Sequence, residues 1–129
     1  MATTRIIAMH RNKGCTAEQA LKARLDYIKN PEKTRDGELV TAFACHAATA
    51  DAEFALARKE YFEITGRWRE DEVIAYQIRQ SFKPGEVTPE EAHQIGIELA
   101  ERFLKGQHAF VVATHTDRRN IHNHLEWSA

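Results

Sequence analysis

The segment that most restricts the fold lies near the C-terminus, where two strand-like stretches are separated by only four polar residues. Residues 109–116 (AFVVATHT) and 121–127 (IHNHLEW) have the composition of strands, and residues 117–120 (DRRN) have that of a turn. So short a connection joins antiparallel neighbours, because parallel strands need a crossover of about a dozen residues or more. The chain therefore predicts a β-hairpin, and a wholly parallel sheet is excluded.

Upstream of this hairpin, strands and helices alternate. We expect strands at 4–9, 38–45 and 72–82, and helices at 16–30, 50–65 and 88–105. Thr16 and Thr88 each begin a capping-box pattern, and Gly66 marks a helix end. Apolar positions at helical spacing predict two inner helix faces, formed by Phe54, Ala57, Tyr61 and Ile64 and by Ile95, Leu99 and Phe103. The order favours an α+β fold, a mostly antiparallel sheet with helices packed on one face and the other free for a site.

Composition narrows the class of protein. The 129 residues are enough for one domain with a single core, and no apolar run has the length of a membrane span or a secretion signal. Two cysteines do not form a disulfide framework, which fits free thiols in a reducing cytoplasm. The formal net charge is -1, so a nucleic-acid site would have to be a local basic patch.

The strongest chemical signal is a group of three histidines in the hairpin. His122 and His124 are two residues apart in a strand, so both rings leave the same face. The turn returns the chain beside the preceding strand, where His115 can point to that face. Three imidazoles converging on a sheet face predict a metal site with open positions for water or substrate. The alternative is a set of ordinary polar residues in a hairpin.

Two turn residues have two interpretations each. Asp117 could accept a hydrogen bond from a histidine ring and fix its tautomer, as metal-bound imidazoles usually require. Asp117 and Asn120 are also residues that turns favour for their own backbone geometry, and for Asn120 we prefer that interpretation.

The segment His115–His124 (HTDRRNIHNH) resembles the third motif of the mobilisation relaxases of conjugative transposons and mobilisable plasmids, in the HUH endonuclease superfamily. Residues 25–33 (LDYIKNPEK) resemble the first motif of that family, which carries a nucleophilic tyrosine, and residues 80–86 (QSFKPGE) resemble the second. The three segments follow the family's order. The resemblance implies a relaxase fold, with the metal histidines on central strands of the sheet and helices behind, and residues 1–129 as the N-terminal part of a longer catalytic domain.

The resemblance also implies a mechanism. Tyr27 would attack a phosphodiester of single-stranded DNA at an origin of transfer and leave a 5′-phosphotyrosine that can be religated. Tyr61, on an apolar helix face, is expected in the core, and Tyr76 in the core or in the wall of the site. Mg²⁺ or Mn²⁺ would serve on His115, His122 and His124, other transition metals could replace them in vitro, and Asp117 would be a candidate proton acceptor.

Basic residues near the three motifs are the candidate DNA contacts. They are Lys29, Lys33, Arg79, Lys83, Arg118 and Arg119, with Ser81 beside them. The expected partners are single-stranded origin DNA, accessory proteins of the relaxosome and a coupling protein, in a bacterial cytoplasm.

The end of the chain departs from the family pattern. After His124 the family continues with an apolar strand, whereas Glu126 here falls on the face of the histidines. If strands are missing, we expect self-association through an uncovered sheet edge. Two other functions stay open: a metal-containing module that binds an origin without cutting it, and a metallohydrolase without a covalent intermediate.

Overall fold

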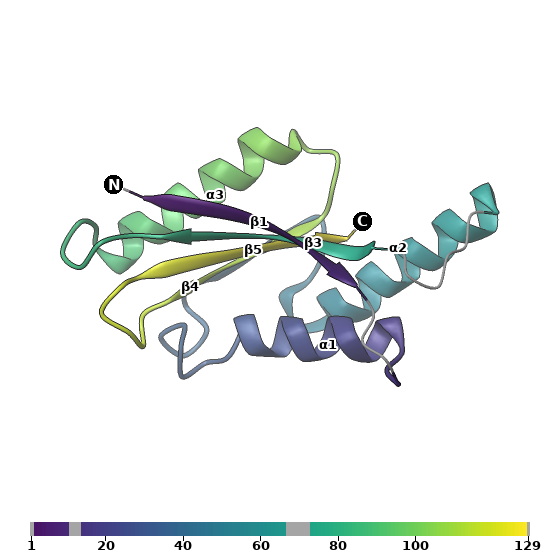
Figure 1. The fold of residues 1–129 in the computed structure, drawn as a ribbon, viewed down its shortest axis with the longest axis horizontal. Coiled ribbons are helices and arrows are strands. Elements are labelled where there is room, and N and C mark those ends of the chain that lie inside the picture. Colours follow the sequence, from purple (N-terminus) through teal and green to yellow (C-terminus); the bar gives the residue numbers. More distant parts are fainter. Residues whose placement is uncertain (1, 11–13, 67–72, 129) are drawn as a thin grey trace.

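The protein is built around one antiparallel sheet of five strands, seen in a computed structural model that describes residues 2–10, 14–66 and 73–128. The strands are β1 (Thr3–His10), β2 (Val40–Phe43), β3 (Val73–Ser81), β4 (Phe110–His115) and β5 (His122–Ser128). They lie in the order β1-β3-β5-β4-β2, each antiparallel to its neighbours. The predicted α+β class and hairpin are confirmed, and β5 is the central strand (Figure 1).

The helices begin and end where the sequence predicts. They are α1 (Ala17–Ile28), α2 (Ala50–Thr65) and α3 (Pro89–Leu104), with a short 3₁₀ helix η1 (Ala47–Thr49) before α2. Thr16 and Thr88 both close capping boxes, and Gly66 ends α2 with a left-handed φ of 69°, which glycine adopts without strain. In the described part of the chain, no helix combines the length and the apolar character needed to cross a membrane.

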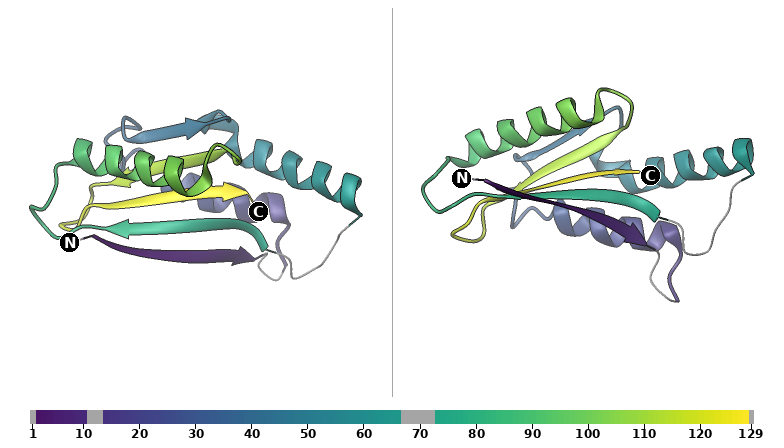
Figure 2. Two further views of the ribbon diagram at one scale, coloured as in Figure 1. Left: turned by 90° about the horizontal axis from the view of Figure 1, so that it is seen from above. Right: turned by 45° about the horizontal axis from the view of Figure 1, so that its top comes forward.

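Helices cover both faces of the sheet, which corrects the predicted one-sided arrangement. On β4, Val111 and Ala113 pack with Leu25 of α1, whereas Val112 packs with Leu104 of α3. Figures 1 and 2 show α3 on one side of the strands and α1 on the other. The sequence contained this signal, because the unbroken apolar run of β4, buried along its whole length, is typical of a strand covered on both faces.

The predicted inner face of α2 is only partly used. Ala50 and Phe54 are buried against the sheet, but Tyr61 is 46% exposed and Ile64 is 84% exposed. The later turns of α2 extend past the end of the sheet (Figure 2), so among the described residues the apolar stripe continues beyond the strands that could cover it. The prediction that Tyr61 lies in the core is therefore wrong.

The inner face of α3 is rotated by one position from the predicted one. Its buried residues are Ala92, Gly96, Ala100 and Leu104. Phe103, predicted to face the sheet, is 49% exposed, and its ring packs at a tilt on that of Trp127, with centroids 5.5 Å apart. Small side chains on this face let the helix lie close to β4 and β5.

A buried polar network occupies the interface between α3 and the sheet. The side-chain amide of Asn123 donates to Gln80 Oε1 (2.9 Å) and to the carbonyl of Ala92 (2.7 Å), and it accepts from the Thr114 hydroxyl. A Cβ atom at Gly96 would stand 2.7 Å from the Asn123 amide nitrogen. The absence of a side chain at Gly96 therefore makes room for this network.

We predict that Gly96→Ala destabilises the protein by roughly 1–3 kcal/mol, although alanine is the better helix former, because the new methyl group overpacks the interface. Urea denaturation would measure the change in free energy of unfolding. Gln94→Ala, at an exposed position of the same helix, should change it by no more than about 0.5 kcal/mol. Equal stability of Gly96→Ala and wild type would contradict the prediction.

Candidate metal centre

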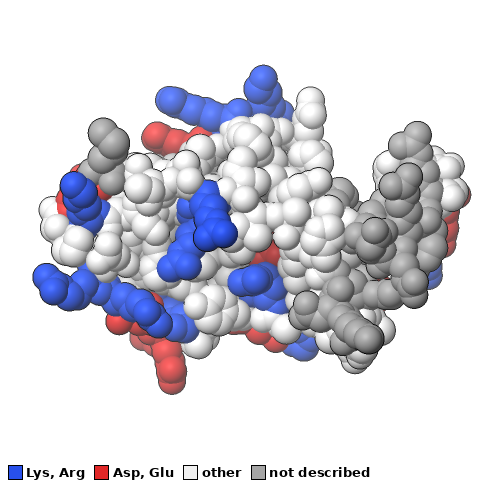
Figure 3. Space-filling view, viewed as in Figure 1, with Lys and Arg blue, Asp and Glu red and all other residues white. Residues whose placement is uncertain are grey.

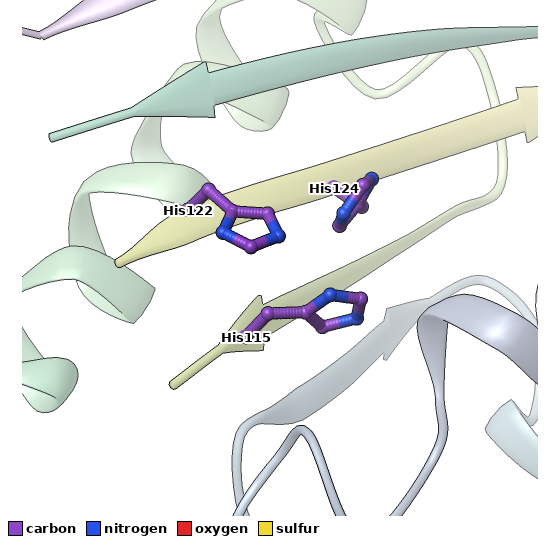
Figure 4. Close-up of side chains that lie close together, drawn as sticks. All are labelled: His115, His122 and His124. Carbon is purple, nitrogen blue, oxygen red and sulfur yellow. The ribbon is translucent and has the colours of Figure 1, made fainter. Parts of the chain in front are cut away.

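Three histidine side chains meet on the face of the sheet that α1 and α2 cover. His115 at the end of β4 is the register partner of His122 on β5, and His124 follows two residues later on the same side. Their rings converge (Figure 4), with centroids 4.4–5.0 Å apart. One ring nitrogen from each lies within 4.8 Å of the other two, so a single ion between them needs only small side-chain movements.

The hydrogen bonds of the rings leave one nitrogen of each histidine facing the cluster. His115 Nε2 donates to the carbonyl of Ile28 (2.8 Å), and His122 Nδ1 donates to that of Asn120 (3.1 Å). By contrast, His115 Nδ1 and His124 Nε2 are buried without a partner. Buried polar atoms are almost always satisfied, so this pattern fits a cation held by the three imidazoles.

The electrostatics favour the form of histidine that binds metal. Burial lowers the pKa of His124 to about 2, and it also holds the pKa values of His115 and His122 below the ordinary value. All three rings are therefore neutral at pH 7, which is the charge state in which an imidazole can bind a metal ion.

Tyr27 is the tyrosine that borders this cluster. It stands next to the last residue of α1, and its ring centroid lies 5.7 Å from that of His115 and 6.0 Å from that of His124. The side chain is 46% exposed. Tyr76 instead stacks on Trp127 in the α3 core, on the opposite face of the sheet, and Tyr61 lies on the projecting part of α2.

Asp117 makes a different contact from the one expected. Its carboxylate accepts a hydrogen bond from Lys33 Nζ at 2.8 Å, and this bond holds the pKa of Asp117 below its usual range. Lys33 Nζ in turn lies 5.4 Å from the centre of the Tyr27 ring. The partners of the imidazoles are two backbone carbonyls and Gln77, which contacts His124. Asp117 therefore adjoins the site through Lys33.

The predicted DNA contacts differ in their surroundings. Arg79 and Ser81 are the register partners of His124 and His122, and therefore share their face of the sheet. Lys83, Arg118 and Arg119 are exposed in neighbouring loops. Lys29 differs, because its ammonium donates to the carbonyl of Ala47 in η1.

Arg5 is a basic residue of this face that the sequence did not identify. It is exposed and is the register partner of Arg79 on β3. Figure 3 shows Lys and Arg side chains across the middle of the molecule and along its lower edge. Alternate residues of β1 face the same side of the sheet. Which side Arg5 faces depends on the pairing of β1 with β3, and the sequence alone does not give that pairing.

Glu126 is an unusual neighbour for the histidines. It lies on β5 two residues after His124, is fully buried, and neither carboxylate oxygen has a hydrogen-bond partner. Burial raises the pKa of Glu126 to about 8, and the charge of Arg24 acts in the opposite direction.

Comparison with known proteins gives consistent matches. Residues 27–129 match the family described as "Relaxase: MobA/VirD2-like, nuclease domain". The chain is 51% identical over 57 residues to "Protein rlx" of Staphylococcus aureus, covering 44% of this chain and 18% of that protein. It is 30% identical over 128 residues to "Group II intron-interrupted relaxase LtrB" of Lactococcus lactis subsp. cremoris (strain MG1363), covering 84% of this chain and 23% of that protein. The chain thus spans less than a quarter of the length of these two relatives.

We predict that Mn²⁺ stabilises the protein through the histidine cluster. At a concentration of about 100 times the dissociation constant, the free energy of unfolding should rise by roughly 2.7 kcal/mol. His122→Ala should weaken Mn²⁺ binding by roughly 100-fold or more, because it removes a ligand. Isothermal titration calorimetry and thermal melts would measure both effects. His46→Ala, an exposed histidine away from the cluster, is the control and should bind like wild type.

Glu126 should make stability depend on pH in metal-free protein. Above the unfolded pKa of 4.5 the unfolded chain loses its proton, but the folded carboxyl group holds it until about pH 8, so stability falls as the pH rises. Between pH 5 and pH 8, wild type should lose roughly 3 kcal/mol relative to Glu126→Gln, at about 1.4 kcal/mol per pKa unit. Urea denaturation in the presence of a chelator would measure this difference. A constant difference at every pH would indicate that folding does not shift the pKa of Glu126.

Proposed function

This chain belongs to the MobA/VirD2-like family of relaxase nuclease domains, and from that premise we propose that it nicks single-stranded DNA with Tyr27 as the nucleophile. The observation that supports the proposal most directly is the position of Tyr27, half exposed and 5.7 Å from the His115 ring. A nucleophile that attacks a phosphodiester must be accessible to DNA and must lie beside the groups that polarise phosphorus. Tyr61 and Tyr76 lack that second property.

A phosphodiester is negatively charged, and this charge opposes attack by a nucleophile. A divalent ion on His115, His122 and His124 would bind non-bridging phosphate oxygens and polarise the phosphorus. The Tyr27 oxygen attacks phosphorus in line, a Tyr27–phosphate bond forms, and the bond to the 3′ oxygen breaks. The phenol proton leaves to solvent, and the 3′ oxygen takes a proton from solvent. The 5′-phosphotyrosine conserves the energy of the broken bond, so the strand can be religated.

Lys33 and Asp117 would assist Tyr27 as a pair. The ammonium of Lys33, 5.4 Å from the centre of the Tyr27 ring, would contact the negative charge of a phosphate held beside the phenol. Asp117, with its lowered pKa, is a weak base, and we assign it to holding Lys33 in place. Its contribution is therefore to position a charge instead of accepting the proton.

The substrate would cross the exposed basic residues of the same face. Arg79 and Ser81, beside the histidines, and Arg118 and Arg119, in the turn, would contact phosphates of a single strand. Lys83 lies in the loop between β3 and α3, and Lys29 would act by fixing α1 to η1. We further propose that the strand comes from an origin of transfer, and that the nick begins conjugative transfer or mobilisation in a bacterial cytoplasm, with accessory and coupling proteins as partners.

We predict that Tyr27→Phe abolishes a covalent protein–DNA adduct while Mn²⁺ affinity and DNA affinity stay within about twofold of wild type, because only the hydroxyl group is lost. The protein would be incubated with Mn²⁺ and single-stranded DNA from the transfer origin of its own genetic element, then analysed on a denaturing gel and by peptide mapping. Tyr61→Phe, a second exposed tyrosine, is the matched control and should form the adduct normally.

Three outcomes would reject this assignment. An adduct that survives Tyr27→Phe, or maps to another tyrosine, would identify a different nucleophile. Cleavage without any adduct would favour a metallohydrolase that uses water. Tight binding of origin DNA without cleavage, by protein that binds Mn²⁺, would favour a module that recognises the origin only.

A further inference from the structure

The three candidate ligands differ in the tautomer that their contacts impose. His115 Nε2–H donates to the Ile28 carbonyl and His122 Nδ1–H donates to the Asn120 carbonyl, so the remaining nitrogen of each ring has a free lone pair. His124 Nδ1 instead lies 2.7 Å from Nε2 of Gln77, and an amide nitrogen only donates. The proton of His124 must then sit on Nε2. In this arrangement two imidazoles are ready for a cation and the third is not.

Rotation of the Gln77 side-chain amide by half a turn would exchange its oxygen and nitrogen and would favour the other tautomer of His124. With Oε1 facing His124, the ring would carry its proton on Nδ1 and donate it, and the lone pair of the buried, unpartnered Nε2 would face the cluster. The same half-turn would move the amide nitrogen of Gln77 away from His124, and there it would need a new hydrogen-bond acceptor. Gln77 is itself buried, so water is not a ready substitute.

Glu126 meets the requirements for that acceptor. It is the register partner of Gln77 in the pairing of β3 with β5. Directly opposed residues on one face of an antiparallel pair have Cβ atoms about 4.5–5.5 Å apart, which is within reach of two long side chains. Both oxygens of Glu126 are buried without a partner, which is costly for a carboxyl group unless another state of the protein uses them.

We propose that Glu126 is a positioning residue of the metal centre: it accepts a hydrogen bond from the turned Gln77 amide, so that Gln77 Oε1 holds His124 in the metal-binding tautomer. Cation binding and the turn of the amide are one event. The Nε2–H bond of His124 breaks as solvent takes the proton, an Nδ1–H bond forms as solvent returns one, and the net charge of the ring is unchanged. This inference rests on the metal site of the proposed function and adds two residues to it.

Substitution of Glu126 separates this role from a purely structural one. Glu126→Leu removes the acceptor and should weaken Mn²⁺ binding by roughly tenfold, as loss of a group that orients a ligand typically does. The same change should raise the melting temperature of metal-free protein, because an unpartnered buried carboxyl group is replaced by an apolar side chain of similar size. Glu126→Gln keeps an acceptor oxygen and should bind Mn²⁺ within about threefold of wild type.

Exchange of the two side chains provides a rescue. In Gln77→Glu with Glu126→Gln, the carboxylate accepts from His124 Nδ1–H and the new amide donates to that carboxylate. The exchanged protein should recover Mn²⁺ affinity, whereas Gln77→Leu alone should lose roughly tenfold. Circular dichroism of each variant would confirm that it is folded before its affinity is compared.

Nitrogen-15 spectra of histidine-labelled full chain would show the tautomer directly, with Zn²⁺ as a diamagnetic probe. Metal-free protein should carry the His124 proton on Nε2, and the Zn²⁺ complex should carry it on Nδ1. A proton on His124 Nδ1 in both the metal-free protein and the Zn²⁺ complex would contradict the proposed rotation of the Gln77 amide. Unchanged Mn²⁺ affinity of Glu126→Leu, or parallel losses of affinity and melting temperature, would overturn the role of Glu126. If wild type binds neither ion, the metal site itself fails, which is a different result.

Discussion

The antiparallel pairing of β4 with β5 is the interaction on which the site depends. It sets His115 opposite His122, and the alternation of the strand then brings His124 to the same side. A slip of one residue would turn the set toward the other face. On the reverse side of the same two strands, the Thr114 hydroxyl bonds to Asn123 under α3. The register that gathers the three imidazoles is thus also held by contacts on the opposite face of the sheet.

Features that are encoded locally could be predicted from the sequence. The capping boxes at Thr16 and Thr88 and the stop at Gly66 depend on residues within one helical turn, so the helix limits followed directly. The histidine cluster is also local, because a four-residue turn and a period of two are enough to bring three rings together. The placement of Tyr27 beside the cluster required the family resemblance, since no local pattern relates α1 to the hairpin.

Features that depend on strand order could not be predicted. Gln77 contacts His124 because β3 pairs with β5, and Arg5 shares that face because β1 pairs with β3; nothing within those segments specifies their neighbours. The ion pair of Lys33 with Asp117 joins distant parts of the chain in the same way. Tyr61 shows a second limit: helical periodicity predicts which side of a helix is apolar, but not where the sheet beneath it ends.

The carbonyl that holds His115 belongs to Ile28, the residue directly after Tyr27. The proposed nucleophile and the carbonyl that orients His115 therefore belong to consecutive residues at the end of α1, and a movement of this helix end would move both. A strand of DNA that displaced the end of this helix would shift the phenol and loosen the ring of His115 together. Access to Tyr27 and the orientation of His115 would then change together whenever the end of α1 moves.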